Sequence, residues 1–198
     1  SEKIGRKKVI EMARRLGTSR QPVREAFIKL AETGLIDIAP QRGTFVKKIS
    51  SHEVDNARFI RQHIEMAIVR RACEHAGKRD VDHIRGIIAQ QREALESGDQ
   101  ERFLDLDDAF HQSIAEAADC QTAWNVTQDL KGQMDRVRFL SLPEATPIGR
   151  LIEQHEDIVD AMAARDGDRA EQAMRVHLEE MLTSLPLLAK RHAGLFTD

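Results

Sequence analysis

The chain has 198 residues, of which 41% are hydrophobic and 32% are charged, and its formal net charge is −3. This length leaves room for one or two domains. The sequence contains no run of about eighteen apolar residues and no signal-peptide pattern, so it predicts neither a membrane span nor secretion. The charge is uneven, because residues 1–50 carry twelve Lys or Arg against five Asp or Glu, whereas the rest carries eighteen against twenty-eight. A basic segment of this kind is typical of a module that binds phosphates. Cys73 and Cys120 lack metal-site spacing, so we expect reduced thiols in a cytoplasmic protein.

The first predicted elements are two helices joined by a turn at Gly17. The apolar side chains of the first helix share one face at helical spacing: Val9, Ile10, Ala13 and Leu16. Thr18 or Ser19 can cap the second helix, and Pro22 is compatible with its first turn. The expected buried positions of the second helix follow the same spacing: Val23, Ala26, Phe27 and Leu30.

After Gly34, alternating apolar residues predict a two-stranded hairpin whose loop runs from Pro40 to Gly43. Two helices followed by such a hairpin, the wing, have the layout of a winged helix-turn-helix that binds DNA. In this fold, the first turn of the second helix reaches phosphates and base edges in the major groove. The expected contacts lie in that turn and at the wing tip: Ser19, Arg20, Gln21, Arg24, Gln41, Arg42 and Gly43. The alternative is a solvated face, but the basic residues fall at element ends that would face DNA.

The remaining pattern is almost entirely helical, so we expect a mainly α protein with two domains. A winged helix-turn-helix domain would span residues 1–49, and an all-α antiparallel bundle would span residues 50–198. Breaks at glycine, serine and proline, including Pro143 and Pro147, predict six helices in the bundle: about 53–75, 80–96, 99–118, 122–140, 148–165 and 168–188. The first of these has the following expected apolar positions: Phe59, Ile60, Ile64, Ala67, Ile68 and Ala72.

Four residues of the bundle form a candidate metal site. Asp107 and His111 lie four apart on one predicted helix and therefore share a face. His155 and His177 lie eleven residues before and nine residues after the turn at Asp166 to Asp168, so antiparallel packing would place them at similar height. One carboxylate and three imidazoles suit a divalent transition metal, with Zn the first expectation and Ni, Mn and Fe compatible. The alternative is that these histidines bind no metal and are ordinary core or surface residues.

Part of the sequence resembles the GntR family of bacterial transcription regulators. The matching residues are Gly17, Ser19, Arg20, Pro22, Val23, Arg24, Glu25 and Ala26. The rest resembles the all-helical FCD type of ligand-binding domain found in the FadR subfamily. Its pattern is matched by Arg61, Glu65, Asp107, Phe110, His111, His155 and His177. The resemblance implies a homodimeric regulator, not an enzyme, whose bundle binds a metal and a small carboxylate metabolite and thereby alters operator binding.

The chain departs from the family pattern at two places. Family members begin with a further helix upstream of the helix-turn-helix, so we expect the DNA-binding domain to lack its first helix here. Asp119 and Cys120 stand where the family usually has Gly-Asn, which would alter the local turn or ligand geometry.

The charge expected at the candidate metal site also favours a carboxylate effector. A divalent ion held by one Asp and three neutral His leaves positive charge, which an anionic ligand can neutralise. Arg61 and Arg138 are the candidates to orient that ligand, and surface ion pairs are their alternative role. Two other functions stay open. One is the same regulator with a metal-free organic or acyl thioester ligand, and the other is a metallohydrolase, although no His-Glu-x-x-His motif accompanies the ligands.

Overall fold

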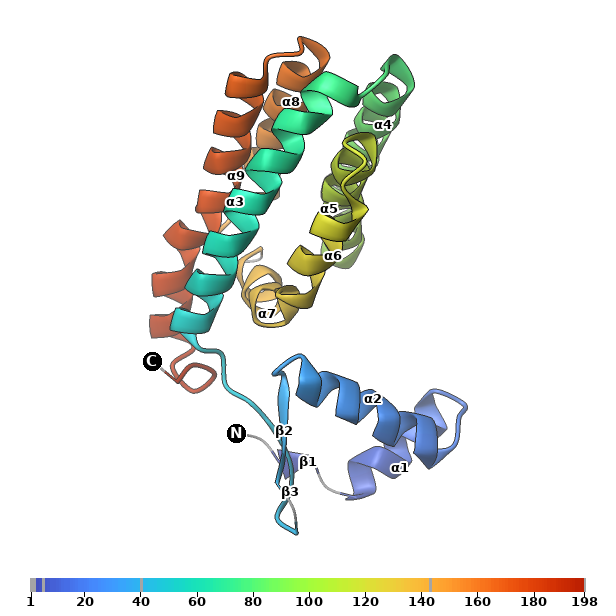
Figure 1. The fold of residues 1–198 in the computed structure, drawn as a ribbon. Coiled ribbons are helices and arrows are strands. Elements are labelled where there is room, and N and C mark those ends of the chain that lie inside the picture. The colour runs from blue at the N-terminus through green and yellow to red at the C-terminus, as the bar shows by residue number, and fades with distance from the viewer. Residues whose placement is uncertain (1–2, 5, 40, 143, 198) are drawn as a thin grey trace.

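The computed structural model of the chain describes residues 3–4, 6–39, 41–142 and 144–197. Pro40 of the expected wing loop and Pro143 between two expected helices lie outside the described residues. A small N-terminal unit with two helices and a sheet lies beneath a bundle of longer helices (Figure 1). The predicted fold class, a winged helix-turn-helix followed by an all-α bundle, is confirmed. No helix among the described residues is long and apolar enough to cross a membrane.

The N-terminal unit contains the predicted wing. Its elements are β1 (Lys3–Ile4), α1 (Arg6–Arg15), α2 (Arg20–Glu32), β2 (Ile36–Ala39) and β3 (Gly43–Val46). β2 and β3 are antiparallel, with Ile36 opposite Val46 and Ala39 opposite Gly43. β1 pairs with the other edge of β3. The sequence did not predict β1, because two residues are too few for an alternating pattern.

In this unit, two side chains that were predicted to be buried in the core are exposed. Its buried side chains are Ala13, Val23, Phe27 and Ile36. Leu16 was expected on the same face, but it is 65% exposed because α1 ends at Arg15 and the chain turns at Gly17, where φ is 61°. Ala26 is also exposed, because it lies on the outer face of α2.

The bundle contains seven described helices instead of six. They are α3 (Ser51–His75), α4 (Lys78–Ser97), α5 (Gln100–Ala117), α6 (Gln121–Asp129), α7 (Lys131–Ser141), α8 (Ile148–Ala163) and α9 (Gly167–Arg191). The prediction of one helix over 122–140 is wrong, because the chain changes helix at Leu130. Gly132, just after this break, packs against the N-terminal unit so closely that a Cβ would lie 3.3 Å from the Leu35 side chain. The break thus lets α7 leave the direction of α6 and contact that unit.

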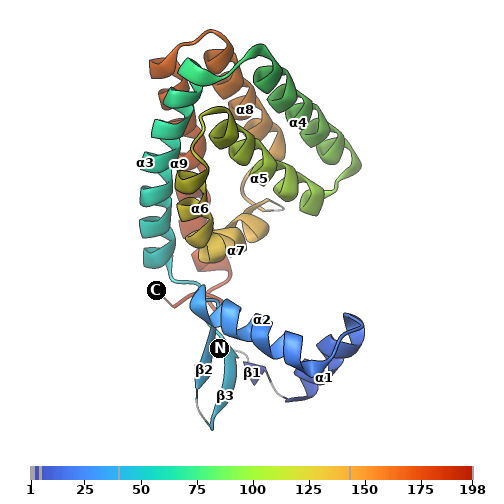
Figure 2. The ribbon, with the colours of Figure 1, turned by 45° about the vertical axis from the view of Figure 1, so that its right-hand side comes forward.

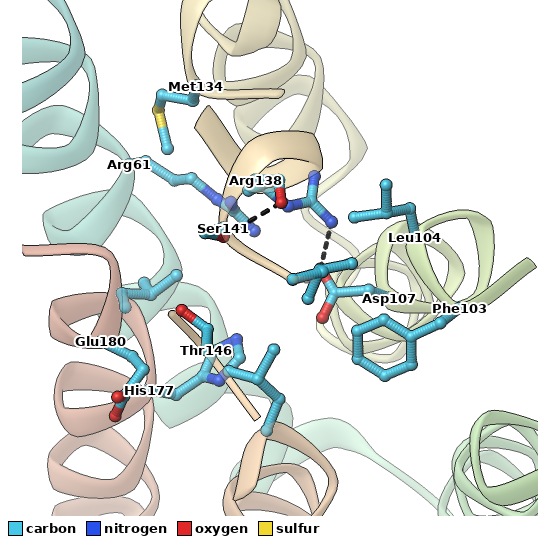
Figure 3. A pocket seen from close by; sticks show the side chains of 13 residues that line it. Arg61, Phe103, Leu104, Asp107, Met134, Arg138, Ser141, Thr146, His177 and Glu180 are labelled. Carbon is cyan, nitrogen blue, oxygen red and sulfur yellow. Dashed lines mark hydrogen bonds and ion pairs between the residues drawn. The ribbon is translucent and has the colours of Figure 1, made fainter. Parts of the chain in front are cut away.

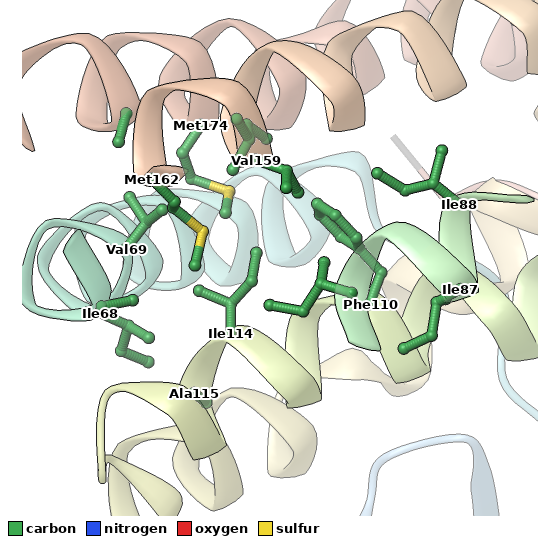
Figure 4. Close-up of a cluster of buried hydrophobic side chains, with 14 of the residues drawn as sticks. Ile68, Val69, Ile87, Ile88, Phe110, Ile114, Ala115, Val159, Met162 and Met174 are labelled. Atoms are coloured by element: carbon green, nitrogen blue, oxygen red, sulfur yellow. The ribbon is translucent and has the colours of Figure 1, made fainter. Parts of the chain in front are cut away.

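The long helices α3 and α9 run antiparallel and side by side, as Figures 1 and 2 both show. α8 packs against α9 and α4, and α5 packs against α4 and α3, so five helices surround a common interior. Figure 4 shows the apolar half of that interior. Its fully buried members include Phe110, Ile114, Ile158 and Met174. This core holds the helices that carry the candidate metal ligands.

The inward face of α3 differs from the predicted one. Phe59 and Ile60 were expected inside but are 55% and 41% exposed, and Ala67 is exposed as well. The buried positions include the charged residues Arg61 and Glu65. Hydrophobic periodicity therefore misplaced this face, because α3 turns charged side chains toward the bundle interior.

Two sets of hydrogen bonds connect the N-terminal unit to the bundle. The linker residue Ile49 bridges to the segment after α9: its N–H donates to the Leu195 carbonyl oxygen at 2.8 Å, and the Thr197 N–H donates to its carbonyl oxygen at 3.0 Å. From α7, Nε2 of Gln133 donates to the Gly34 carbonyl oxygen at 3.2 Å. The C-terminal segment and α7 therefore both hold the winged unit against the bundle.

Candidate metal centre and ligand cavity

The structure brings together the four residues predicted as metal ligands. They come from α5, α8 and α9, and their ligand atoms all lie within 4.8 Å of one another: Asp107, His111, His155 and His177. All four side chains are buried. Phe110 supports the arrangement, since its ring stacks on the His155 ring with a centroid separation of 4.0 Å. Residues far apart in sequence thus form one compact donor set.

The spacing of the donor atoms suits a metal ion. Nε2 of His177 lies 3.1 Å from Nε2 of His111 and 3.3 Å from Nε2 of His155. Oδ1 of Asp107 lies 3.2 Å from Nε2 of His155. Donors bound to one ion at ~2.0–2.1 Å are separated by roughly 2.9–3.4 Å in tetrahedral or octahedral arrangements. Nε2 of His111 lies farther from Asp107, at 4.0 Å from its Oδ2, so three separations match, and the donor chemistry suits a divalent transition metal.

The other ring nitrogens of two histidines face glutamine side chains. Nδ1 of His155 lies 2.8 Å from Oε1 of Gln91, on α4, and Nδ1 of His177 lies 3.1 Å from Oε1 of Gln154, on α8. Sequence reasoning missed both glutamines. Glutamines at these positions complete no motif, and only the packing of the helices brings each one to its histidine.

Glu65 takes the corresponding place beside His111. Its Oε2 lies 2.5 Å from Nδ1 of His111, and its Oε1 pairs with Nε of Arg61. Burial opposes ionisation of Glu65, but the charges of Arg61 and His111 outweigh it and lower the pKa of Glu65 to about 2. Glu65 is therefore an anion inside the bundle. Nη2 of Arg61 is buried and has no hydrogen-bond partner among the described residues.

Arg138 pairs with three carboxylates. Its Nη2 pairs with Oδ2 of Asp107, and its Nη1 lies 2.9 Å from Asp108 and 2.8 Å from Asp135. Burial would raise the pKa of Asp107, yet the charge of the Arg138 guanidinium holds it well below its usual range. Asp107 is therefore ionised, with one oxygen toward His155 and the other toward Arg138.

Burial has the opposite effect on the imidazoles. It lowers the pKa of His155 despite the nearby Asp107 carboxylate, and it lowers the pKa of His177 well below its usual range, with help from the neighbouring histidines. Both rings are therefore neutral near pH 7. Neutral imidazole is the form that binds metals.

A cavity of about 60 Å³ lies beside the candidate metal ligands Asp107 and His177 (Figure 3). Arg61, Asp107, Arg138 and His177 supply polar groups on its wall. Much of the remaining wall is apolar: Phe103, Leu104, Met134, Leu142, Leu151 and Leu178. This volume exceeds the ~10–15 Å³ that a single ordered water needs, so the cavity can hold water or a small ligand. The structure thus places both predicted effector arginines at one small cavity that reaches the candidate metal site.

The predicted DNA-contacting residues lie on the N-terminal unit. Ser19 is the N-cap residue of α2, and the exposed residues Arg20, Gln21 and Arg24 follow it in the first turns. The side chain of Gln21 donates to Glu25 at 3.0 Å. Of the other three predicted residues, Gln41 and Arg42 lie in the turn between the strands, and Gly43 begins β3. This hairpin points away from the bundle in Figures 1 and 2, which leaves its tip accessible.

Comparison with known proteins agrees with this two-part organisation. The family "Bacterial regulatory proteins, gntR family" matches residues 8–46, and the family "FCD domain" matches residues 57–180. Among solved structures, that of E. coli McbR/YncC covers 93% of this chain and 86% of its own, with a TM-score of 0.78. Its sequence identity is 21%, so this likeness concerns the fold alone.

Two curated relatives are regulators of transcription. The HTH-type transcriptional repressor RspR of Escherichia coli (strain K12) is 45% identical over 188 residues, covering 95% of this chain and 82% of RspR. The probable D-xylose utilization operon transcriptional repressor of Paenarthrobacter nicotinovorans is 31% identical over 94% of this chain and 80% of its own length. The chain therefore belongs to the GntR family of bacterial transcriptional regulators, and it is a DNA-binding regulator with an FCD domain, not an enzyme.

Proposed function

We propose that this regulator is a homodimer that senses a small carboxylate through a divalent transition metal, with Zn the first expectation. The observation that carries the proposal is the convergence of one carboxylate and three imidazoles on one buried point. Clustered polar side chains are costly inside a bundle unless something satisfies them. A metal ion bound to all four would offset that cost.

The local charges favour an anion as the second ligand. Glu65 pairs with Arg61, and Asp107 shares Arg138 with Asp108 and Asp135, which Lys131 also contacts. A divalent ion would therefore leave a net positive charge at a partly open, partly apolar cavity, and an anionic oxygen would stabilise it. The unpartnered Nη2 of Arg61 offers such an oxygen a charge-assisted hydrogen bond. We assign Arg61 and Arg138 to the effector site, with Arg61 as the group that has a donor to spare.

The size of the cavity favours a small ligand. About 60 Å³ accommodates a carboxylate of few heavy atoms, whereas an acyl thioester would require the bundle to open considerably. The small carboxylate is therefore preferred over the larger organic ligand.

We propose that DNA binding uses the first turn of α2 and the wing tip. Arg20 and Arg24 are the groups with the charge and length to reach phosphates or guanine edges. The remaining proposed contacts are Ser19, Gln21, Gln41, Arg42 and Gly43. Two copies of the chain would place two such helices in successive major grooves, one helical turn of operator DNA apart. A ligand that alters the bundle would change how these helices are presented.

The experiment is a thermal-shift measurement on protein stripped by chelation, with and without added Zn²⁺, followed by a panel of small monocarboxylates. Zn²⁺ should raise the melting temperature of the wild type and of the exposed-histidine control His83→Ala, but not that of His111→Ala. Carboxylates should raise it further only in the presence of metal. If Zn²⁺ leaves the wild type unchanged while a carboxylate or thioester shifts it, a metal-free ligand domain replaces this proposal.

A further inference from the structure

The amide of Gln91 has only one orientation that satisfies both of its neighbours. Its Nε2 lies 3.1 Å from the carbonyl oxygen of Leu106, which can only accept a hydrogen bond. The NH₂ group must therefore face Leu106, and the amide oxygen faces Nδ1 of His155 at 2.8 Å. Because that oxygen can only accept, Nδ1 of His155 must carry the proton.

The same reasoning applies to Gln154, with a carboxylate in place of the backbone carbonyl. Nε2 of Gln154 donates to Oε2 of Glu180 at 3.1 Å, and Nε of Arg150 lies 3.0 Å from the same oxygen. The amide oxygen of Gln154 then faces Nδ1 of His177 at 3.1 Å. Nδ1 of His177 must therefore donate as well.

The position of these protons determines the state of the opposite ring nitrogens, Nε2 of His155 and Nε2 of His177. A neutral imidazole with its proton on Nδ1 has a bare lone pair on Nε2. Nε2 of His155 lies 3.3 Å from Nε2 of His177 and 3.2 Å from Oδ1 of the ionised Asp107, so lone pairs face one another without a proton between them. Such a contact is repulsive by itself and becomes favourable when a cation lies between the two nitrogens.

We propose that Gln91 and Gln154 are positioning residues that fix His155 and His177 in the Nδ1–H tautomer, so that both Nε2 lone pairs are aimed at the metal before it binds. This inference rests on the proposed metal site. A free imidazole favours the proton on Nε2, the tautomer that cannot ligate through that atom. The two amides reverse this preference, which removes a proton rearrangement from metal binding. Outer groups of this kind typically change metal affinity by about 10–100-fold.

The first test reads the tautomers directly in chelator-stripped protein labelled with ¹⁵N-histidine, at a pH where the rings are neutral. Long-range ¹H–¹⁵N spectra distinguish a protonated from an unprotonated ring nitrogen. In the wild type we expect His155 and His177 as Nδ1–H forms. In Gln91→Met the His155 ring should shift toward the Nε2–H form, and in Gln154→Met the His177 ring should do the same. Each variant leaves the other histidine as an internal reference.

Gln91→Glu supplies the matched control. It loses the donor to Leu106, as Gln91→Met does, but it keeps an oxygen that can accept from His155. A purely structural role would make the two variants behave alike, whereas tautomer control predicts that only Gln91→Glu retains the Nδ1–H form. If Gln91→Met does not fold, Gln154→Met tests the same idea at a less deeply buried position, since Gln154 is 9% exposed and Gln91 is 0% exposed. Circular dichroism identifies the variants that fold.

A second readout is Zn²⁺ affinity, measured by competition with a chromophoric chelator. Gln91→Met and Gln154→Met should each bind Zn²⁺ about 10–100-fold more weakly than the wild type. Histidines that keep the Nδ1–H form in both Met variants, or that are Nε2–H in the wild type, would overturn the inference. Correct tautomers in a wild type that does not bind Zn²⁺ would instead overturn the proposed metal function, so the two failures are distinguishable.

Discussion

Arg136 and Arg138 lie two residues apart on α7 and bind different parts of the protein. Nη1 of Arg136 donates to the carbonyl oxygen of Lys47 in the winged unit at 2.8 Å, whereas Nη2 of Arg138 pairs with Asp107 inside the bundle. Residues two apart on a helix point in different directions, which is how one short helix serves both partners. α7 therefore contacts both the cavity and the DNA-binding unit.

We expect Arg136→Ala to loosen this connection without affecting metal binding. The lost hydrogen bond is worth about 0.5–1.5 kcal/mol, so local opening of residues 33–48 should become roughly 2–13-fold more frequent. Amide hydrogen exchange measured by mass spectrometry checks this, with the exposed bundle residue Arg79→Ala as the control. Ligand-induced changes at residues 33–48 should also shrink in Arg136→Ala. An undiminished response there would mean that α7 is not the connection.

Arg61→Lys should weaken carboxylate binding while leaving the metal in place. Lysine keeps the charge beside Glu65 but cannot bond to the carboxylate of Glu65 and to a ligand with the fork geometry of arginine. We expect at least about a tenfold loss of affinity for the carboxylate with the largest thermal shift, measured by calorimetry on Zn²⁺-loaded protein. Arg79→Lys, a conservative change at an exposed position away from the cavity, is the matched control. Equal affinities in wild type and Arg61→Lys would remove Arg61 from the ligand site.

The stability of the metal-free protein should fall as the pH is lowered from 7 to 5. The pKa values of His155 and His177 are lowered in the folded protein, so below about pH 6.5 the unfolded chain binds more protons than the folded one. Each such histidine contributes a slope of up to about 1.4 kcal/mol per pH unit in the free energy of unfolding. The stabilisation is complete above the unfolded pKa and is lost as the pH falls toward the lowered folded pKa.

Urea unfolding at a series of pH values measures this slope. His177→Gln should remove roughly half of it, because one of the two titrating groups is gone. His83→Gln, at an exposed position, should leave the slope as in the wild type. A pH-independent free energy of unfolding between pH 7 and 5 would show that the two imidazoles are not buried in their neutral form.

Arg20→Ala and Arg24→Ala should each weaken binding to a DNA duplex selected from a random-sequence library. Removing one phosphate contact lowers the salt slope of the binding constant by about 1. A base-edge contact would instead cost about 1–3 kcal/mol and relax the sequence preference at one position. Fluorescence anisotropy at several salt concentrations separates these outcomes. Arg79→Ala should bind like the wild type, and wild-type affinity at matched salt in both helix variants would exclude them as contacts.

The sequence alone determined the features that depend on local chemistry. Glycines such as Gly17 and Gly98 end helices because they adopt positive φ, at 61° and 69°, with little steric cost. Helical spacing placed Asp107 and His111 on one face, and equal distances from a turn aligned His155 with His177. The candidate ligand set was therefore predictable once antiparallel packing was assumed.

Only the tertiary structure decided the features that depend on which surfaces meet. The sequence treated Arg61 and Arg138 as equivalent, but their partners differ, since Arg138 is surrounded by three carboxylates and Arg61 retains a buried donor. The inward turn of the charged face of α3, the break at Leu130 and the pairing of Gln91 with His155 also come from contacts between distant elements. Local periodicity reports only how residues repeat along one helix, and the identity of the facing helix sets what each side chain meets.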